Sequence, residues 1–558
     1  MRSTVVALAG CLTCTAAIAA AADGNCPPVL DHTALATTAI EEVTGRPLDA
    51  ETRYRIGKIT VIRQNVFNPE DPAENNAAFR FANRWHANTR EGVIRDLLLF
   101  REGDVVTGNV VAESERLLRA KSYLYDARIV ADRVCVVADA AGGDALPEAE
   151  LVVVTRDVWS LSPEFSVTRT GGEHRVQVGV SEINLAGSGA HLDFTVFDNP
   201  DREGVSLSYE DANLGTGRVG FKLRYDDTDD GDRVEARIGQ PFYALDARRA
   251  WHVSYHRAKT LQGLYDVGER VDEFGRDYRL AQIWTGWSRG RDDGWVNRLS
   301  TGVTLDDWRL MPVEDSDLAL TSRKFLYPWV AFQRIQDEYA QARNVDRVQT
   351  TEDVYLGRQY DALFGYSPRG DGHIVASAEF RDGLQRGDSG ILRYGLRASG
   401  YWNTTDRHAE NVVARAWARY RHRQTDRLAI ILDAETTLTD GLTTDQQLLI
   451  GGSSGLRGYP NRYQTGTRQF RISAEERYYT DLYPLRVLRV AVAGFVDVGR
   501  AWSSAHDNDT LVNAGVGLRL ESTRTNRNLV YHIDVAFPLV DGPGVGGVEV
   551  TLTSKRSL

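Results

Sequence analysis

The chain has 558 residues, of which 42% are hydrophobic and 26% are charged, and its formal net charge is -11. An acidic chain without a long basic block is a poor partner for nucleic acid, so we expect no nucleic-acid partner. Beyond the N-terminus there is no run of about eighteen apolar residues, which excludes helical membrane spans but not a membrane barrel, because barrel strands alternate apolar and polar positions.

Residues 1–22 have the pattern of a secretory signal peptide. A basic Arg2 is followed by an apolar stretch and by small residues just before Asp23. We predict that the mature chain begins near Asp23. A lipoprotein-type signal ending at Cys11 is the alternative, although few apolar residues precede that cysteine.

Removal of this signal leaves two cysteines, Cys26 and Cys135. An even number of cysteines in an exported protein suits a disulfide, which here would tie the N-terminal tail to the domain that follows it. Two unpaired thiols remain the alternative, because the sequence does not give the distance between them.

The periodicity of apolar residues predicts a small α+β domain over residues 53–162. We expect the preceding residues, 23–52, to form an N-terminal tail or a short helix. Residues 68–88 are predicted to be a polar insertion with two prolines, at positions 69 and 72. The predicted elements are, in chain order, a strand at 55–62, helices at 89–100 and 107–121, and strands at 126–137 and 151–160.

From about residue 161 onward, strand-like segments recur between turns rich in Gly, Asp and Asn. Their alternation of apolar and polar residues is clearest at 205–209, 219–225, 533–537 and 548–553. The candidates outnumber sixteen, but a membrane-crossing strand needs about 9 to 11 residues, so several of them are expected to be hairpins outside the membrane. Trp and Tyr residues at positions 284, 308, 327 and 329, among others, suit girdles at the membrane interfaces, although aromatic strand ends also occur in soluble sandwiches.

Near the C-terminus a glycine-rich segment reads Gly-Gly-Ser-Ser-Gly-Leu-Arg-Gly-Tyr-Pro at 451–460, with Arg457 near its tip. In the strand 490–499 that follows, alternation places Asp497 on the face opposite four valines, which is the watery side. On the preceding strand, Glu475 shares a face with Arg471, Ser473 and Arg477, so it is the acid that we expect to face inward. An inward carboxylate is a natural partner for a guanidinium, whereas a solvated loop arginine is the alternative.

These residues resemble the BamA/TamA outer-membrane insertase superfamily. In that superfamily a loop with an Arg-Gly-Phe or Arg-Gly-Tyr tip folds back into a barrel, where the arginine meets acidic residues of nearby strands. The resemblance implies that residues 439–468 form this loop. It also implies that the loop is locked in place by Arg457, Gly458, Tyr459, Glu475, Phe495, Asp497 and Gly499.

The resemblance further implies a transmembrane antiparallel β-barrel of sixteen strands over 163–558, preceded by a single POTRA-like periplasmic domain over 53–162. A seam is expected between a first strand near 175–183 and a last strand near 548–553. The chain departs from the family in two ways: it has one POTRA-like unit rather than an array, and it does not end on an aromatic residue.

Other motifs have simpler explanations. Ser453 lies in a Gly-x-Ser-x-Gly pattern, but Pro460 denies it the helix that a nucleophile elbow needs. The glycines at 542–547 and the aspartates at 226–232 are predicted to be hairpin turns rather than a nucleotide site or a calcium site. We therefore predict no enzyme activity, no metal site and no cofactor.

The predicted function is insertion or translocation of polypeptides in a Gram-negative outer membrane. A barrel with a weak seam can open and offer strand edges to an incoming chain. The expected partners are outer-membrane lipids, a client or passenger polypeptide, and periplasmic accessory proteins. An outer-membrane channel or lipid-handling barrel without insertase activity is the alternative.

Overall fold

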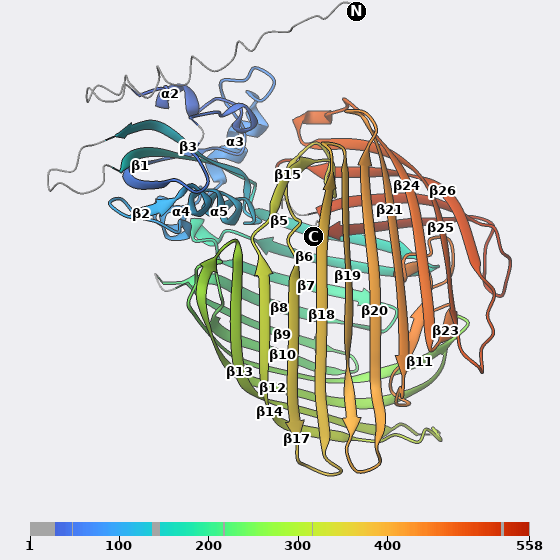
Figure 1. Cartoon of the computed structure of the whole chain (residues 1–558). Coiled ribbons are helices and arrows are strands. Elements are labelled where there is room, and N and C mark those ends of the chain that lie inside the picture. Colours follow the sequence, from blue (N-terminus) through green and yellow to red (C-terminus); the bar gives the residue numbers. More distant parts are fainter. Residues whose placement is uncertain are drawn as a thin grey trace, which may run out of the picture. The chain divides into compact units, whose positions relative to one another are not determined.

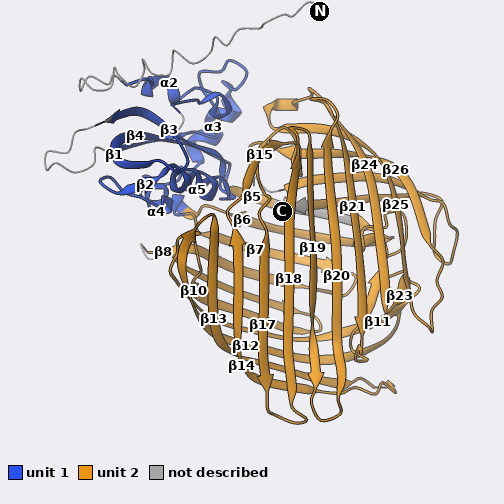
Figure 2. Ribbon diagram, in the orientation of Figure 1, with its two compact units in different colours: residues 1–159, 186–188 blue, residues 160–185, 189–558 orange. Residues whose placement is uncertain are grey.

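The structure is a computed structural model of the whole chain, and it describes residues 28–46, 48–136, 146–215, 218–314, 316–525 and 529–556 (Figure 1). The chain divides after Trp159 into two compact units, with residues 186–188 grouped with the first (Figure 2). The predicted signal peptide, residues 1–22, lies outside the described residues. No described helix is both long enough and apolar enough to cross a membrane.

The first unit is an α+β fold on a four-stranded sheet with the strand order β2-β1-β4-β3. Strand β1 is parallel to β4, while β1–β2 and β3–β4 are antiparallel. The run of apolar residues at 151–154 lies in β4 and is almost completely buried. Its elements are α2 (His32–Leu35), η2 (Ile40–Glu42), β1 (Arg53–Gln64), α3 (Ala77–Trp85), α4 (Glu91–Leu97), β2 (Val105–Thr107), α5 (Gly108–Arg119), β3 (Leu124–Val136) and β4 (Pro147–Asp157).

Two elements of this unit differ from the sequence-based expectation. The segment 68–88 contains the helix α3, whose first turn is capped by Asn76, because its side chain accepts a hydrogen bond from the Phe79 amide at 2.9 Å. Phe79 stacks on Phe67 with ring centroids 3.9 Å apart, which holds this helix against the domain. Strand β2 was not predicted because three residues are too few to show a period of two.

Of the two cysteines in the predicted disulfide, only Cys135 lies within the described residues. Cys135, at the end of β3, is disulfide-bonded. Cys26, the partner that the sequence suggested, lies outside the described residues.

The second unit is a closed antiparallel barrel, which has twenty strands within the part of the chain that the structure describes. The expectation of sixteen strands is therefore wrong: strand number depends on how the ring closes, and no local pattern encodes it. The barrel strands are β5 (Leu161–Thr170), β6 (Glu173–Glu182), β7 (His191–Asn199), β8 (Arg202–Leu214), β9 (Val219–Thr228), β10 (Gly231–Gln240), β11 (Arg249–Asp266), β12 (Glu269–Asp292), β13 (Trp295–Pro312), β14 (Arg323–Gln336), β17 (Gln359–Ser367), β18 (His373–Arg386), β19 (Gly390–Asn403), β20 (His408–Arg423), β21 (Leu428–Asp440), β24 (Arg468–Tyr479), β25 (Leu488–Trp502), β26 (Leu511–Ser522), β27 (Leu529–Pro538) and β28 (Glu549–Arg556).

Short helices and strands occupy the connections between barrel strands. Two pairs of short strands form separate two-stranded sheets outside the barrel ladder. The first pair joins β14 to β17, and the second joins β21 to β24. Because successive strands alternate in direction, these two connections lie at opposite ends of the barrel. The connecting elements are η3 (Leu185–Gly187), β15 (Tyr339–Arg343), β16 (Thr351–Tyr355), β22 (Leu448–Ile450), η4 (Gly452–Ser454), β23 (Gln464–Gly466) and η5 (Pro484–Arg486).

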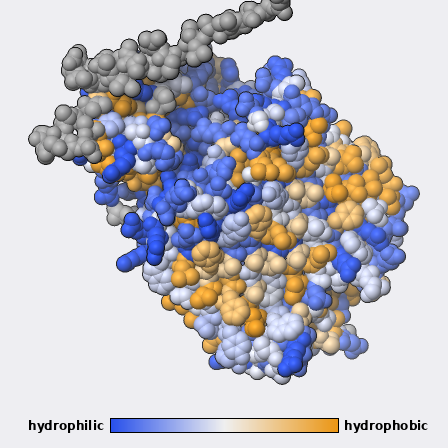
Figure 3. Space-filling model, viewed as in Figure 1, coloured by the Kyte–Doolittle hydropathy of each residue, from blue (hydrophilic) through white to orange (hydrophobic). Residues whose placement is uncertain are grey.

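The two faces of the barrel strands differ as the alternation predicts. In β25, Val496 is 44% exposed while the next residue, Asp497, is completely buried. Exposed leucine, valine and phenylalanine side chains recur along the barrel strands, and hydrophobic residues are spread over the barrel face that Figure 3 shows. An apolar outer face with polar side chains inside is the pattern of a barrel whose outer face meets lipid.

Several aromatic residues that suited an interfacial girdle instead lie on the inner face. Tyr327 and Trp329 are buried in a cluster that Trp284 also joins, and the Trp308 indole donates to an inner aspartate, Asp306, at 2.7 Å. The girdle interpretation is wrong for these four aromatic residues, because a shift of one position along a strand moves a side chain to the other face.

Candidate functional site

The loop between β21 and β24 folds back against the inner face of the barrel. Its two short strands, β22 and β23, pair with each other and lead to a tip over residues 451–463. Gly455 and Gly458 have φ values of 97° and 89°, a left-handed conformation that glycine adopts without strain. Leu456 and Tyr459 flank Arg457 and are completely buried in an apolar cluster that includes Ile450 of β22. This packing fixes the backbone on both sides of the arginine.

Arg457 ends among acidic side chains of three different strands. Its guanidinium forms a bidentate pair with Asp497, with Nε to Oδ2 at 2.8 Å and Nη2 to Oδ1 at 2.7 Å. Nη1 donates to Glu475 at 3.1 Å and to Asp534 at 3.3 Å, and Nη2 donates to the Ser473 hydroxyl at 3.2 Å. The structure thus brings Arg457 together with both acids that the sequence singled out, and adds Asp534.

Two further arginines complete the charge balance. Arg519 of β26 donates to Glu475 at 3.0 and 2.6 Å and to Asp534 at 2.5 Å. Arg477 donates from Nε to Glu475 at 2.6 Å. Three guanidinium groups therefore face three carboxylates, and their formal charges cancel. We call this set the Arg457 cluster: Arg457, Glu475, Arg477, Asp497, Arg519 and Asp534.

Arg519 and Asp534 were not predicted from the sequence, although a signal for both was present. Asp534 is the one polar residue of the predicted strand 533–537, and Arg519 occupies an inner position of β26. A charged residue on the inner face of each of four successive strands, β24 to β27, indicates a shared site. Strand register had to be known before these positions could be matched.

Phe495, Gly499 and Tyr459 shape the space around the arginine. The Arg457 guanidinium carbon lies 3.4 Å from the centroid of the Phe495 ring, a cation–π contact. A Cβ on Gly499 would come within 2.9 Å of the Leu456 side chain, so a larger residue at this position would displace Leu456 from its cluster. The Tyr459 hydroxyl donates to the carbonyl of Val512 at 2.6 Å, which ties the tip to β26.

The energetic role of the Arg457 cluster follows from its burial. The side chains of Asp497 and Arg519 are 0% exposed, and that of Arg457 is 9% exposed. The loss of water around buried charges offsets much of their attraction, so such a cluster adds little net stability. Loss of one partner leaves another charge uncompensated, which costs roughly 3–5 kcal/mol. The cluster therefore specifies one position of the loop rather than stabilising the barrel as a whole.

The same loop is bonded to the N-terminal strands of the barrel. The Asn461 amide donates to the carbonyl of Thr170 and to the carboxylate of Glu173, both at 2.7 Å, in the turn between β5 and β6. Arg462 pairs with Asp201, between β7 and β8, at 2.7 Å. The loop therefore holds β24–β27 through the Arg457 cluster and the first strands through these contacts.

The junction between β28 and β5, which closes the ring, is the weakest ladder in the barrel. Within the described residues a single registered pair, Leu552 with Arg169, joins the two strands. The neighbouring ladders β27–β28 and β5–β6 have eight and ten registered pairs. Outside the ladder, Glu549 accepts a hydrogen bond from the amide of Gly172 at 3.1 Å and lies 3.5 Å from Arg169. We call this junction the seam.

The position of the seam corrects one sequence-based expectation. The segment near 175–183 is β6, the second strand, whereas β5 pairs with β28. Strand β5 contains Pro163, which lacks an amide hydrogen and is normally confined to edge strands. Its presence fits a strand that has a full ladder on one side only.

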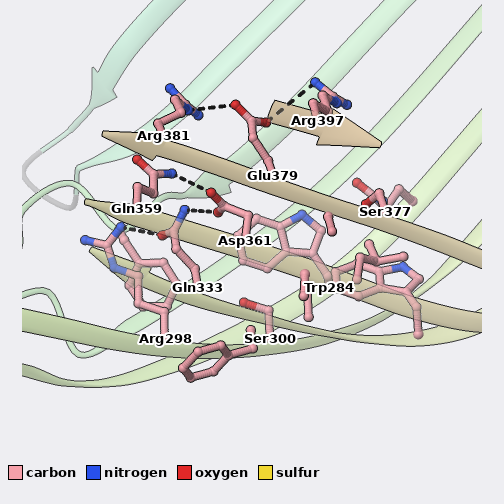
Figure 4. A pocket seen from close by; sticks show the side chains of 18 residues that line it. Trp284, Arg298, Ser300, Gln333, Gln359, Asp361, Ser377, Glu379, Arg381 and Arg397 are labelled. Carbon is pink, nitrogen blue, oxygen red and sulfur yellow. Dashed lines mark hydrogen bonds and ion pairs between the residues drawn. The ribbon is translucent and has the colours of Figure 1, made fainter. Parts of the chain in front are cut away.

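The inner wall also contains a cavity of about 400 Å³, between β12 and β19 (Figure 4). Trp284, Trp329 and Phe242 supply its aromatic lining. Its polar lining includes a ladder in which Arg298 donates to Gln333 at 3.0 Å and Gln333 donates to Asp361 at 2.6 Å. The inner wall thus presents aromatic and polar groups to the lumen.

Comparison with known proteins finds similarity to solved structures only. No family model matches the sequence, and no curated protein sequence matches it. Solved structures similar to this one include BamA from Haemophilus ducreyi lacking POTRA domains 1–3, with 12% identity over 91% of this chain and 85% of that chain and a TM-score of 0.38. CdiB from Acinetobacter baumannii has 12% identity over 90% of this chain and 73% of that chain, with a TM-score of 0.39. CdiB from Escherichia coli has 12% identity over 94% and 95%, with a TM-score of 0.38.

Proposed function

We propose that this protein is an outer-membrane barrel that inserts or translocates polypeptides by opening its seam. The observation that supports this proposal is the single registered pair between β28 and β5 in a ring whose adjacent ladders are complete. Unpaired strand edges are templates for another strand. An open seam would therefore offer hydrogen-bonding edges to a client strand inside the bilayer, where those edges cannot bond to water.

The Arg457 loop is the element that controls this seam in our proposal. It is bonded to β24–β27 on one side of the seam and to the β5–β6 turn on the other. With both sets of contacts in place the two edges are held near each other. Loss of either set would let the edges separate without breaking a full ladder.

The first unit would act as the POTRA-like domain and would lie in the periplasm. There it would bind periplasmic accessory proteins and would pass client polypeptides to the barrel. Its sheet ends at β2 on one side and at β3 on the other, and the β3 edge already bonds to Val29 and Arg46. Strand addition at the β2 edge is therefore the binding mode we propose. The partners we propose are therefore outer-membrane lipids, a client or passenger polypeptide and periplasmic accessory proteins. This activity makes and breaks no covalent bond, so we propose no enzymatic role.

A disulfide across the seam tests this function. Arg169 and Leu552 are register partners, so the R169C/L552C variant should form a disulfide when oxidised. The L518C/I533C variant is a matched control, because these residues are register partners within the complete β26–β27 ladder. Liposomes containing each variant are given a urea-denatured outer-membrane barrel protein, and its folding is followed by heat-modifiable migration in gels.

We expect oxidation to stop folding of the client by the seam variant, and a reductant to restore it. The control pair should fold the client equally well in both states. Equal folding by the oxidised seam variant contradicts the proposal. A wild-type protein that does not accelerate folding, but conducts ions in planar bilayers, favours the alternative of a channel or a lipid-handling barrel.

A further inference from the structure

A second segment crosses the inside of the barrel, at the end opposite the Arg457 loop. Residues 337–358 connect β14 to β17, and their short strands β15 and β16 form a hairpin with its tip at residues 344–350. The tip is bonded to β19, β20, β24, β25 and β26. In the ring, β26 lies seven positions beyond β17, so the hairpin spans most of the lumen.

The first anchor of this tip is a buried carboxylate, Glu521 of β26. It forms an ion pair with Arg347, and both side chains are almost completely buried. Glu521 also accepts hydrogen bonds from the Val348 amide at 2.6 Å and from the Thr350 hydroxyl at 3.2 Å. Three groups of one tight turn thus converge on one side chain of the wall. Without the tip, this carboxylate would lose its ion-pair partner.

A second anchor uses the opposite charge. Asp346 accepts from Arg393 of β19 at 2.9 Å and from Arg421 of β20 at 3.4 Å. Arg421 also donates to the carbonyl of Val345 at 3.2 Å. Neighbouring residues of the tip, one acidic and one basic, therefore meet wall residues of the complementary sign. This complementarity specifies one docked position of the tip.

Uncharged residues of the tip complete the docking. Gln349 donates to the carbonyl of Thr480 at 3.0 Å and accepts from Arg489 of β25 at 2.6 Å. The Tyr479 hydroxyl donates to the carbonyl of Asn344 at 3.2 Å. Val348 is completely buried against Tyr479 and its neighbours, so the tip excludes water from this contact.

The docked hairpin and the Arg457 cluster share two strands. On β26, Arg519 belongs to the cluster and Glu521, two residues on, anchors the hairpin. On β24, Glu475 belongs to the cluster and Tyr479 bonds to the hairpin. Arg477 lies between these two on the same face and pairs with Glu475. The two inward segments thus bind adjacent positions of the same pair of strands.

We propose that the hairpin 337–358 is a plug that closes the lumen at the end opposite the Arg457 loop, and that its release is coupled to release of that loop through β24 and β26. The plug keeps small ions out of the lumen while the seam works at the side of the barrel. A polypeptide that passes through the lumen must displace the tip from Glu521. Ion conduction through the lumen needs no client, so it reports on the plug separately from the proposed insertion activity.

Planar-bilayer conductance of the purified full-length protein tests the plug. Gln336 donates to the carbonyl of Arg358 at 2.8 Å at the root of the hairpin, so residues 337–357 can be replaced by an Asn-Gly turn. This variant should conduct at least tenfold more current than the wild type. Wild-type current from a folded, heat-modifiable deletion variant overturns the proposal.

A charge reversal guards against misfolding of the deletion variant. Arg347→Glu places two carboxylates together and should open the lumen, whereas R347E/E521Q removes the repulsion, keeps an oxygen acceptor for the Val348 amide and should close it again. A matched control is Arg415→Glu, which places like charges at a pair between an exposed arginine and Glu435 of the neighbouring strand. Equal currents from R347E and the wild type, or open lumens in both R347E and R347E/E521Q, contradict the plug.

Hydrogen exchange tests the coupling. The Val348 amide, which donates to Glu521, reports on undocking of the tip. Arg457→Ala removes a residue of the Arg457 cluster that does not contact Glu521 in the bonds described above, and it should accelerate exchange of this amide at least tenfold if the two segments are coupled. Exchange within twofold of the wild-type rate overturns the coupling and leaves the plug to be judged by conductance alone.

Discussion

Replacement of Arg457 by alanine should release the inward loop without unfolding the barrel. The substitution removes one cation from a cluster of three arginines and three carboxylates, so a buried site gains a net negative charge. Asp497 loses both of its guanidinium hydrogen bonds and keeps the Ser473 hydroxyl at 2.7 Å. Removal of one partner from a buried pair costs roughly 3–5 kcal/mol. We assign this cost to the docked loop, because the barrel ladders do not pass through the loop.

Hydrogen exchange measured by mass spectrometry in nanodiscs detects this local opening. The amide of Leu456 donates to the Gly451 carbonyl at 3.1 Å and that of Ser453 donates to Asn461 at 2.7 Å, so both are protected only while the loop is folded. A loss of 3–5 kcal/mol corresponds to exchange about 10² to 5 × 10³ times faster. Protection of the β25 and β26 amides should stay unchanged.

A matched variant separates the buried site from charge effects in general. Arg415→Ala removes an arginine whose side chain is 52% exposed from a pair with Glu435. Exposed pairs contribute about 0.2–1 kcal/mol, so exchange of the loop should hardly change. Loop exchange within threefold of wild type in Arg457→Ala, or equal acceleration in both variants, refutes the assignment of the lock to the Arg457 cluster.

Two other perturbations test the inward segments. Gly499→Val places a branched side chain where a Cβ alone comes within 2.9 Å of Leu456, so we expect limited proteolysis to cleave the Arg457 loop faster than in the wild type. The control is Gly494→Val on the same strand, because an added Cβ there has no neighbouring atom within 4 Å. It should be digested like the wild type. Burial, aided by the charge of Asp346, raises the pKa of Glu352 in β16 from 4.5 to about 7. Because the pKa of Glu352 is higher in the docked hairpin than in the free one, the docked form favours the protonated carboxyl. The stability of docking is therefore greatest below about pH 4.5 and falls by roughly 3 kcal/mol as the pH rises through 7. Exchange of the tip amides, corrected for intrinsic rates, should therefore be slower at pH 5 than at pH 8, and Glu352→Gln should reduce the difference. An equal pH dependence in this variant and in the wild type contradicts the role of Glu352.

Local sequence patterns predicted the parts of this molecule that depend on neighbouring residues. The alternation at 490–499 placed Asp497 on the inner face and the valines outside, which is how β25 is buried. The order of helices and strands in the first unit followed from periodicities of 3.6 and 2, apart from the helix α3 and the short β2. The Arg457 contact with Asp497 and Glu475 was suggested by resemblance, and inward alternation supplied its physical reason.

Features that depend on closure of the ring were not predictable from local patterns. Strand number and the identity of the first seam strand depend on which strands meet. Pro163 indicates that β5 has a free side, but no local pattern shows that this side faces β28. The hairpin 337–358 reads as a polar connection. It lies inside the barrel because Glu521, 174 residues from Arg347, occupies an inner position of a distant strand. Pairings over such a distance become visible only when the register of every strand between them is known.

The placement of the two inward segments favours the seam as the junction at which the proposed opening occurs. Both bind to β24–β26, and the Arg457 cluster extends to Asp534 of β27, so four successive strands are cross-linked on their inner face by buried charges. Strand β28 follows this block and pairs fully with β27, yet meets β5 through one registered pair. A strain on the ring therefore separates β28 from β5 before it separates any strand within the block, since the block has both ladders and cross-links to lose. Because β24–β27 are cross-linked in this way, we expect the C-terminal edge of the open seam, β28, to keep its position. Strands β5 and β6 should move instead, once Asn461 no longer bonds to the turn between them.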